Sequence, residues 1–346
     1  MKFNKLGDTN VDVSSLCLGT QTWGEQNSEA EAYEQMDLAV DCGINFFDTA
    51  EVYPFPVKKE TSGRTEEIIG NWFKKRKCRN KVVLATKVAS RFGMSWLTEE
   101  ETRLTPSRIK KAIEGSLKRL KTDYIDLYQL HWPDRFANFF GRLGYNPSGD
   151  DIYIPLENQL EALKELVDEG KVKHIGVSNE TPWGLMTFMK TSESRKWPRL
   201  VSIQNPYSLM NRTFEVGIAE VSIREKCGLL SYSPLAFGLL TGKYAKDNEV
   251  TNARITKFSS ASKRYTGVRS MEAADEYVKI AAKYGLKPSQ MALAFNLSRP
   301  FMTSTIIGAT KLDQLKENIE SVDIVLPDEI LEEIEVAHNN DLYPCP

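Results

Sequence analysis

The feature that most constrains this chain is a regular alternation of short apolar runs with longer helical segments. The apolar runs have few polar positions, as expected of parallel strands that are buried on both faces. Eight strand–helix units in succession favour a closed parallel barrel over an open sheet. We therefore predict an α/β protein with a (β/α)8 TIM-barrel fold, with strands at 15–20, 45–48, 82–88, 124–131, 174–179, 201–207, 229–236 and 304–309.

Capping residues mark the ends of several predicted helices. Gly43 and Gly170 suit the C-terminal ends of helices at 31–43 and 156–170. Thr105 suits an N-cap, with Pro106 in the first turn of a helix at 106–120. Further helices are expected at 65–76, from residue 182, at 213–228 and at 271–285, after an N-terminal β-hairpin formed by 2–6 and 11–16. Because no Pro/Gly/Ser-rich linker divides residues 1–346, we expect one domain.

The composition excludes several classes of protein. The 346 residues carry a formal net charge of −2, which gives no basic footprint for nucleic acid or anionic membranes. The mean hydropathy is −0.39, and no apolar run approaches the length of about 18 residues that a membrane helix needs. The first ten residues have no apolar signal region, so we expect a cytoplasmic location.

The five cysteines suggest neither disulfides nor a metal site. Their number is odd, and no CxxC or other metal-ligand spacing occurs. We expect reduced thiols and no bound metal, the cysteines being Cys17, Cys42, Cys78, Cys227 and Cys345.

Three long connections follow strand ends and should lie on the C-terminal rim of the barrel, at 56–63, 134–155 and 243–267. Loops on this rim shape the ligand site in such folds. The alternative is that they are surface insertions with no contact to a substrate. The connection 134–155 argues against this, because it carries the aromatic residues Phe136, Phe139, Phe140 and Tyr145 close to His131 in the sequence. The C-terminal tail, with Tyr343, could also fold over the rim.

Four residues at strand ends form a candidate proton-donating group: Asp48, Tyr53, Lys87 and His131. A free tyrosine has a pKa of about 10 and is a poor acid at neutral pH. A lysine beside it favours the phenolate and lowers that pKa, and a carboxylate keeps the lysine charged. A tyrosine tuned in this way can give a proton to a carbonyl oxygen.

Each of these residues taken alone would more often be structural. A buried Asp–Lys pair is often structural, a tyrosine near a turn usually packs, and a rim histidine usually has a structural partner. The four in the order D-x4-Y, K, H are more specific. The other two histidines, His174 and His338, do not close a strand in this way.

With these residues in place, the chain resembles the aldo-keto reductase family over its whole length, and within it the bacterial Tas-like reductases. The matching segments are DTAEVY (48–53), HIGVSN (174–179), SIQNPYS (202–208), LLSYSPLAFGLLTGKY (229–244) and TIIGATKLDQLKENI (305–319), with GTQTWGEQNSEAEA (19–32), TEEIIGNW (65–72), LHWPDR (130–135) and GVSNETPWG (176–184) as supporting details. The resemblance implies a (β/α)8 barrel that reduces a small-molecule carbonyl compound with NADPH.

The resemblance also implies roles for individual residues. Tyr53 would be the general acid, tuned by Lys87 and Asp48, and His131 would orient and polarise the carbonyl. The nicotinamide carboxamide would be held by side chains that both donate and accept hydrogen bonds, namely Ser178, Asn179 and Gln204. Tyr232 would stack on the nicotinamide ring; the alternative for it is a tyrosine packed in the core. Thr20, Gln21 and Asp48 are further implied cofactor contacts.

The rest of the cofactor would follow the last two strands. The pyrophosphate loop would be formed by Ser233, Leu235, Gly238, Leu239 and Lys243, where glycine permits close approach of the backbone. The adenosine end would lie at Gly308, Ala309, Thr310, Gln314, Glu317 and Asn318. There is no GxGxxG motif, so a Rossmann mode of binding is not expected.

One position departs from the family pattern. Many members have a basic residue where this chain has Gln314, and that residue meets the 2′-phosphate. Arg254 or Lys311 could supply the charge, and Arg254 fits better because its planar guanidinium can grip a phosphate with two hydrogen bonds. The alternative is that Arg254 is a solvated loop charge. We favour NADP over NAD.

Two other classes of function remain open. One is a barrel that binds NADP but acts mainly as a redox-sensing partner of another protein. The other is a lyase or aldolase with Lys87 as a Schiff base, which is less favoured because Asp48 would keep that lysine protonated. The aromatic connection at 134–155 suggests an apolar or aromatic substrate. The oligomeric state cannot be inferred from the sequence.

Overall fold

The computed structural model describes residues 1–91, 94, 96–97, 102–146, 151–244, 250, 253–258 and 263–346. Two of the long connections expected on the rim, 134–155 and 243–267, therefore lie partly outside the described residues.

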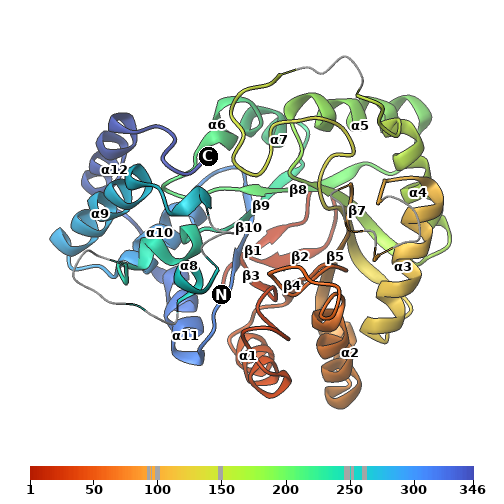
Figure 1. Cartoon of the computed structure of the whole chain (residues 1–346), viewed down its shortest axis with the longest axis horizontal. Coiled ribbons are helices and arrows are strands. Elements are labelled where there is room, and N and C mark those ends of the chain that lie inside the picture. The colour runs from red at the N-terminus through yellow and green to blue at the C-terminus, as the bar shows by residue number, and fades with distance from the viewer. Residues whose placement is uncertain are drawn as a thin grey trace.

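Eight parallel strands close into a barrel, which confirms the predicted fold (Figure 1). The barrel strands are β3 (Leu16–Gly19), β4 (Phe46–Asp48), β5 (Val83–Val88), β6 (Ile125–Leu130), β7 (Val172–Ser178), β8 (Leu200–Pro206), β9 (Gly228–Tyr232) and β10 (Met302–Ile307). Each strand pairs with the next in sequence, and β10 pairs with β3 to close the ring. The predicted N-terminal hairpin is present as β1 (Phe3–Lys5) and β2 (Asp12–Ser14).

Helices surround the barrel. Those of the described residues are α1 (Glu29–Asp41), α2 (Arg64–Arg76), α3 (Pro106–Leu120), α4 (Leu156–Asp168), α5 (Pro182–Arg195), α6 (Thr213–Gly217), α7 (Ala219–Arg224), α8 (Arg254–Lys257), α9 (Val268–Lys283), α10 (Pro288–Leu297), α11 (Leu312–Glu320) and α12 (Asp328–Asn340). Short 3₁₀ turns add η1 (Arg79–Lys81), η2 (Ala236–Thr241), η4 (Lys263–Tyr265) and η5 (Ser321–Asp323). The N-cap expected at Thr105 is confirmed, since its side chain accepts a hydrogen bond from the backbone of Arg108.

Two helix predictions need correction. The helix expected at 213–228 is divided into α6 and α7 at Ile218, directly after Gly217, a residue whose backbone freedom weakens helices. The sequence analysis also missed α10, which is buried on nearly every side, from Met291 to Asn296. A helix buried all round shows no alternation of polar and apolar faces, so its period cannot be recognised.

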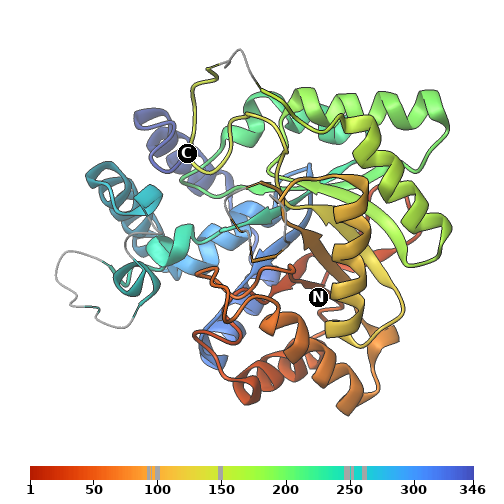
Figure 2. The same cartoon turned by 45° about the vertical axis from the view of Figure 1, so that its right-hand side comes forward.

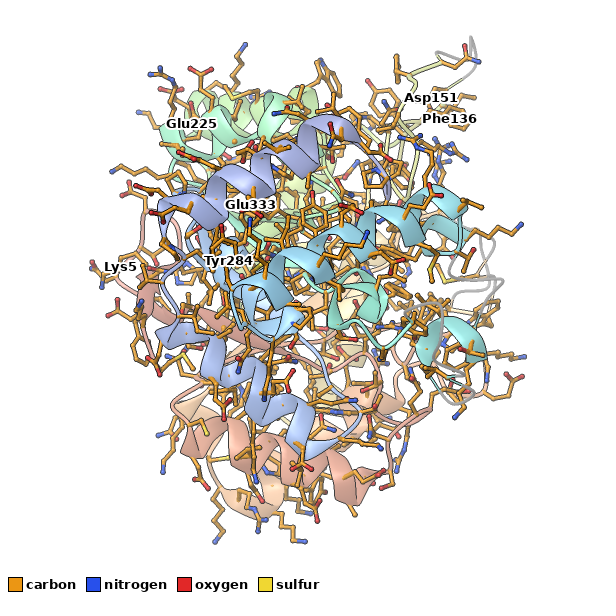
Figure 3. The ribbon with its side chains drawn as sticks, turned by 90° about the vertical axis from the view of Figure 1, so that its left-hand side faces the viewer. Lys5, Phe136, Asp151, Glu225, Tyr284 and Glu333 are labelled. Atoms are coloured by element: carbon orange, nitrogen blue, oxygen red, sulfur yellow. The ribbon has the colours of Figure 1, made fainter. Side chains whose placement is uncertain are left out.

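The core has two parts because successive strand residues point to opposite faces. Phe47 and Leu84 point outward and pack with the helices, whereas Phe46 and Ala85 fill the barrel interior. Leu6 in the hairpin packs against the interior part and closes one end of the barrel. Figure 3 shows Lys5 and Glu225 at this end, with Phe136 and Asp151 at the opposite end.

The opposite end is the C-terminal rim, where the connection after β6 and the C-terminal tail lie together (Figure 2). Phe139 of this connection packs in a cluster with Tyr53 and Trp132, whereas Phe136, Phe140 and Tyr145 remain exposed. Ser270 donates a hydrogen bond to the Pro344 carbonyl oxygen at 2.8 Å, which holds the tail on the rim. Among the described residues, no helix combines the length and apolar character needed to cross a membrane.

Candidate active site

A buried ion pair lies at the centre of the candidate site. Asp48 ends β4 and Lys87 lies near the end of β5, and the Lys87 Nζ to Asp48 Oδ2 distance is 2.7 Å. Lys87 Nζ also donates to the Thr49 carbonyl oxygen at 2.7 Å, and it lies 5.0 Å from the ring centroid of Tyr53. Two acceptors from the chain therefore hold the ammonium group beside Tyr53.

Tyr53 and His131 complete the group of four. Tyr53 follows β4 and His131 directly follows β6, and their ring centroids are 5.7 Å apart at 75°. Trp132 packs on His131, with ring centroids 4.7 Å apart. The structure thus brings together all four residues singled out in the sequence, at the C-terminal ends of neighbouring strands.

Burial controls the protonation of these groups. Burial raises the pKa of Tyr53 above its ordinary value, and Lys87 opposes this rise without overcoming it. This net direction is opposite to the one expected from the sequence, where the desolvation of a buried phenol was not visible. Burial alone would lower the pKa of Lys87, but Asp48 and Tyr53 outweigh it and the pKa is raised. Burial, and secondarily Lys87, holds the pKa of His131 well below its usual value.

Amide side chains join Asp48 to the next strands. Asp48 Oδ1 accepts hydrogen bonds from Gln204 Nε2 at 2.8 Å and from Gln129 Nε2 at 3.4 Å. Sequence reasoning missed Gln129, although it lies two residues before His131 and so on the same side of the strand. Its register partner in β5 is Lys87.

Ser178, Asn179 and Tyr232 form one hydrogen-bonded chain beside this group. Asn179 Nδ2 donates to the His131 carbonyl oxygen at 2.9 Å, and Tyr232 donates to Asn179 Oδ1 at 2.7 Å. Ser178 Oγ donates to the Gln204 carbonyl oxygen at 2.8 Å. Thr20 lies on the other side, where its hydroxyl donates to the Asp48 carbonyl oxygen at 2.9 Å.

The connection after β9 has an unusual backbone. Ser233, Ala236, Phe237 and Gly238 all have positive φ. Strained backbone of this kind concentrates at functional sites. A Cβ built on Gly238 would lie 2.9 Å from Lys243 Nζ, so only glycine lets this lysine lie against the turn. Leu235 and Leu239 flank the turn.

Arg254 is half-buried in the same region. Its guanidinium carbon lies 4.0 Å from the ring centroid of Phe237 and 5.2 Å from that of Phe55, and Nη2 donates to Gln21 Oε1. Nε has no hydrogen-bond partner among the described residues. Burial lowers the pKa of Arg254 to about 10. Its packing on two aromatic rings argues against the solvated loop charge considered as an alternative.

The segment after β10 has its own contacts. Gln314 Oε1 accepts from the backbone of Thr310 at 3.1 Å, and Glu317 Oε2 accepts from Lys287 at 3.1 Å. Ala309 and Asn318 are buried, and Gly308 is exposed. Among the described residues, Arg254 makes no hydrogen bond to this segment.

Comparison of the sequence with known proteins identifies the family of this chain. The aldo/keto reductase family model matches residues 15–339. The chain is 47% identical to protein tas of Escherichia coli over 348 aligned residues, which cover all of both chains. The chain belongs to the aldo/keto reductase family. It is also 36% identical to the uncharacterized oxidoreductase YrpG of Bacillus subtilis, covering 100% of this chain and 97% of that one. A putative voltage-gated potassium channel subunit beta of Schizosaccharomyces pombe is 30% identical, covering 97% and 93%.

Membership of the aldo/keto reductase family implies oxidoreduction of carbonyl compounds with a nicotinamide cofactor. Among the described residues of this aldo/keto reductase, no three His, Cys, Asp or Glu side chains are grouped as metal ligands.

Proposed function

We propose that this protein reduces an aldehyde or ketone to an alcohol with NADPH, and that Tyr53 is the general acid. The observation that carries the proposal is the buried group of Asp48, Tyr53, Lys87 and His131 at the C-terminal ends of the barrel strands. Active sites in this fold are built at that end.

The residues present fit a nicotinamide dinucleotide. When bound, the cofactor supplies a hydride to the carbonyl carbon. Ser178, Asn179 and Gln204 would hold the carboxamide, and Tyr232 would lie against the ring. The turn at Gly238, with Lys243 beside it, suits a pyrophosphate because backbone and ammonium donors meet there. Arg254 has an unused buried Nε–H, which suits a phosphate oxygen.

Tyr53 is suited to donate a proton. Its raised pKa keeps the phenol protonated at neutral pH, so the proton is present when the substrate arrives. The ammonium group of Lys87 would stabilise the phenolate left behind. The lowered pKa of His131 keeps its imidazole neutral, so it would act as a hydrogen-bond donor and not as a second charge.

The same geometry argues against a Schiff base at Lys87. A nucleophilic lysine must lose its proton, which a desolvated or cationic environment promotes. Lys87 instead has a raised pKa because Asp48 and Tyr53 outweigh its burial.

Substitution of the proposed acid tests this function. We expect Tyr53→Phe to lower kcat for NADPH-dependent aldehyde reduction by about 10²–10⁴, the usual effect of a general acid. NADPH binding, followed by quenching of tryptophan fluorescence, should be retained. Full turnover by Tyr53→Phe would show that the mechanism is wrong, and a loss of NADPH binding would show a different role for Tyr53.

A further inference from the structure

A cavity separate from the candidate active site lies outside the barrel, beside the connection that carries Tyr53. It has a volume of about 390 Å³ and is formed by one face of α3 and by the segments that precede α2 and α3. Arg108, Lys111 and Arg119 line it from α3, and Lys59 lines it from the opposite side. The spacing of the α3 residues places them on one side of the helix.

The charge of the lining is mainly positive. Among the described lining residues, the four cations face one carboxylate, that of Glu51. Among the described residues, Lys59 and Lys111 form no ion pair, whereas Arg119 Nε contacts Glu66 at 2.7 Å. A concave site with an excess of one charge attracts ions of the opposite sign.

Arg108 provides a donor that the described residues leave unused. The residue is only 7% exposed, and Nη2 donates to Glu51 Oε1 at 2.6 Å. Its Nε–H has no acceptor among the described residues. The hydroxyl of Tyr128, which does not line the cavity but lies within electrostatic range of Arg108 and Arg119, is also unpartnered among the described residues. Buried polar groups of this kind are rare, so an acceptor from outside the chain is expected here.

We propose that this cavity binds a small phosphate-bearing compound. Arginine recognises phosphate oxygens with its planar donors, and the two unpaired lysines supply further charge. The volume exceeds that of inorganic phosphate, and Trp96, Leu97 and Ala112 give part of the wall an apolar surface. A phosphate ester with a small organic part therefore fits better than a bare ion.

The site is joined to the catalytic connection by hydrogen bonds. Glu51 lies between Asp48 and Tyr53, and its backbone N–H donates to the Lys87 carbonyl oxygen at 3.2 Å. Its carboxylate accepts from the Ala89 backbone at 2.6 Å as well as from Arg108. A phosphate group at Arg108 would share that guanidinium with Glu51.

Inorganic phosphate is the probe for the test. Sodium phosphate is titrated into the full-length protein by calorimetry, with sodium chloride at matched ionic strength as the reference. The test variant is Lys59→Gln/Lys111→Gln, which removes two exposed side chains and should fold normally. The matched control is Lys74→Gln/Lys190→Gln, which makes the same charge change at two exposed lysines of α2 and α5 that do not line the cavity.

We expect saturable phosphate binding by the wild type, weakened at least about tenfold in the test variant and unchanged in the control. The variant Lys243→Gln distinguishes this cavity from the proposed pyrophosphate turn. The proposal is overturned if phosphate gives no response beyond chloride, if the test variant binds like the wild type, or if Lys243→Gln alone abolishes binding. These outcomes do not depend on catalytic activity.

Discussion

At the scale of single residues, Lys87 shows how a charge can be kept inside a barrel. It is 0% exposed, yet Asp48 and Thr49 both accept hydrogen bonds from its ammonium group. Removing one partner from such a pair usually costs much stability, because the remaining charge stays buried without compensation. The arrangement therefore fixes the position of the ammonium group of Lys87 beside the ring of Tyr53.

The lowered pKa of His131 predicts a pH dependence of stability. The unfolded imidazole has a pKa of about 6.5, whereas the folded one titrates well below that value. Between these two values only the unfolded chain takes up the proton, so stability is full above about pH 7 and falls as the pH is lowered. The slope from this residue reaches at most about 1.4 kcal/mol per pH unit.

Thermal unfolding between pH 5 and 8 measures this effect. The slope of Tm against pH should be smaller in His131→Asn than in the wild type. His338→Asn is the matched control, since His338 is less buried and its pKa is lowered less. If the slopes of Tm against pH are equal in the wild type and His131→Asn, the pH dependence of stability does not come from His131.

Arg254 is expected to decide the choice of nucleotide. Arg254→Ala should weaken NADPH binding by roughly tenfold or more and NADH binding much less, because a charged hydrogen bond to the 2′-phosphate is lost. Fluorescence titration with both nucleotides measures the difference. Lys311→Ala tests the other candidate cation, and equal weakening of both nucleotides by Arg254→Ala would remove Arg254 from the 2′-phosphate site.

At the scale of elements, α2 and α3 come into backbone contact at Gly70. A Cβ built on Gly70 of α2 would lie 2.2 Å from the carbonyl oxygen of Arg119. Such a contact requires one helix to move, so only glycine fits at the present spacing.

Gly70→Ala is therefore expected to destabilise the protein by about 1–3 kcal/mol or more, although alanine is the better helix former. Gly144→Ala is the control, because nothing lies within 4 Å of a Cβ built there. Denaturant unfolding compares the two variants. Wild-type stability in Gly70→Ala would show that α2 and α3 can separate at little cost.

The elements also show what could be predicted from sequence. The strands and the residues at their ends were found because parallel strands leave apolar runs and place their C-terminal ends on one rim. The pairing of Glu51 with Arg108 was not found, because it joins residues 57 positions apart and leaves no local pattern. For the same reason the aromatic setting of Arg254 was missed. The roles of the site residues and the one-domain organisation remain predictions.

At the scale of the whole molecule, the hairpin closes the barrel end opposite the candidate site. Leu6 is 0% exposed and packs against residues of the barrel interior such as Val201. Its position makes the hairpin part of the core.

Leu6→Ala should lower the free energy of unfolding by about 2–5 kcal/mol through the cavity that it leaves. Phe3→Ala, in the same hairpin but 50% exposed, should have little effect. Chemical denaturation followed by circular dichroism measures both. A similar loss of unfolding free energy in the two variants would mean that the whole hairpin stabilises the barrel, and not the burial of Leu6 in particular.

The seam of the barrel joins its first strand to its last. β3 pairs with β10, with Leu16 opposite Thr305, and the Thr305 backbone donates to the Ser15 carbonyl oxygen at 2.8 Å. During synthesis on the ribosome, Asp48, Tyr53, Lys87 and His131 emerge early, but β3 has no partner on this side until β10 follows. The nascent chain must therefore carry an open strand edge through most of its translation, the state in which sheets are most prone to pair with other chains.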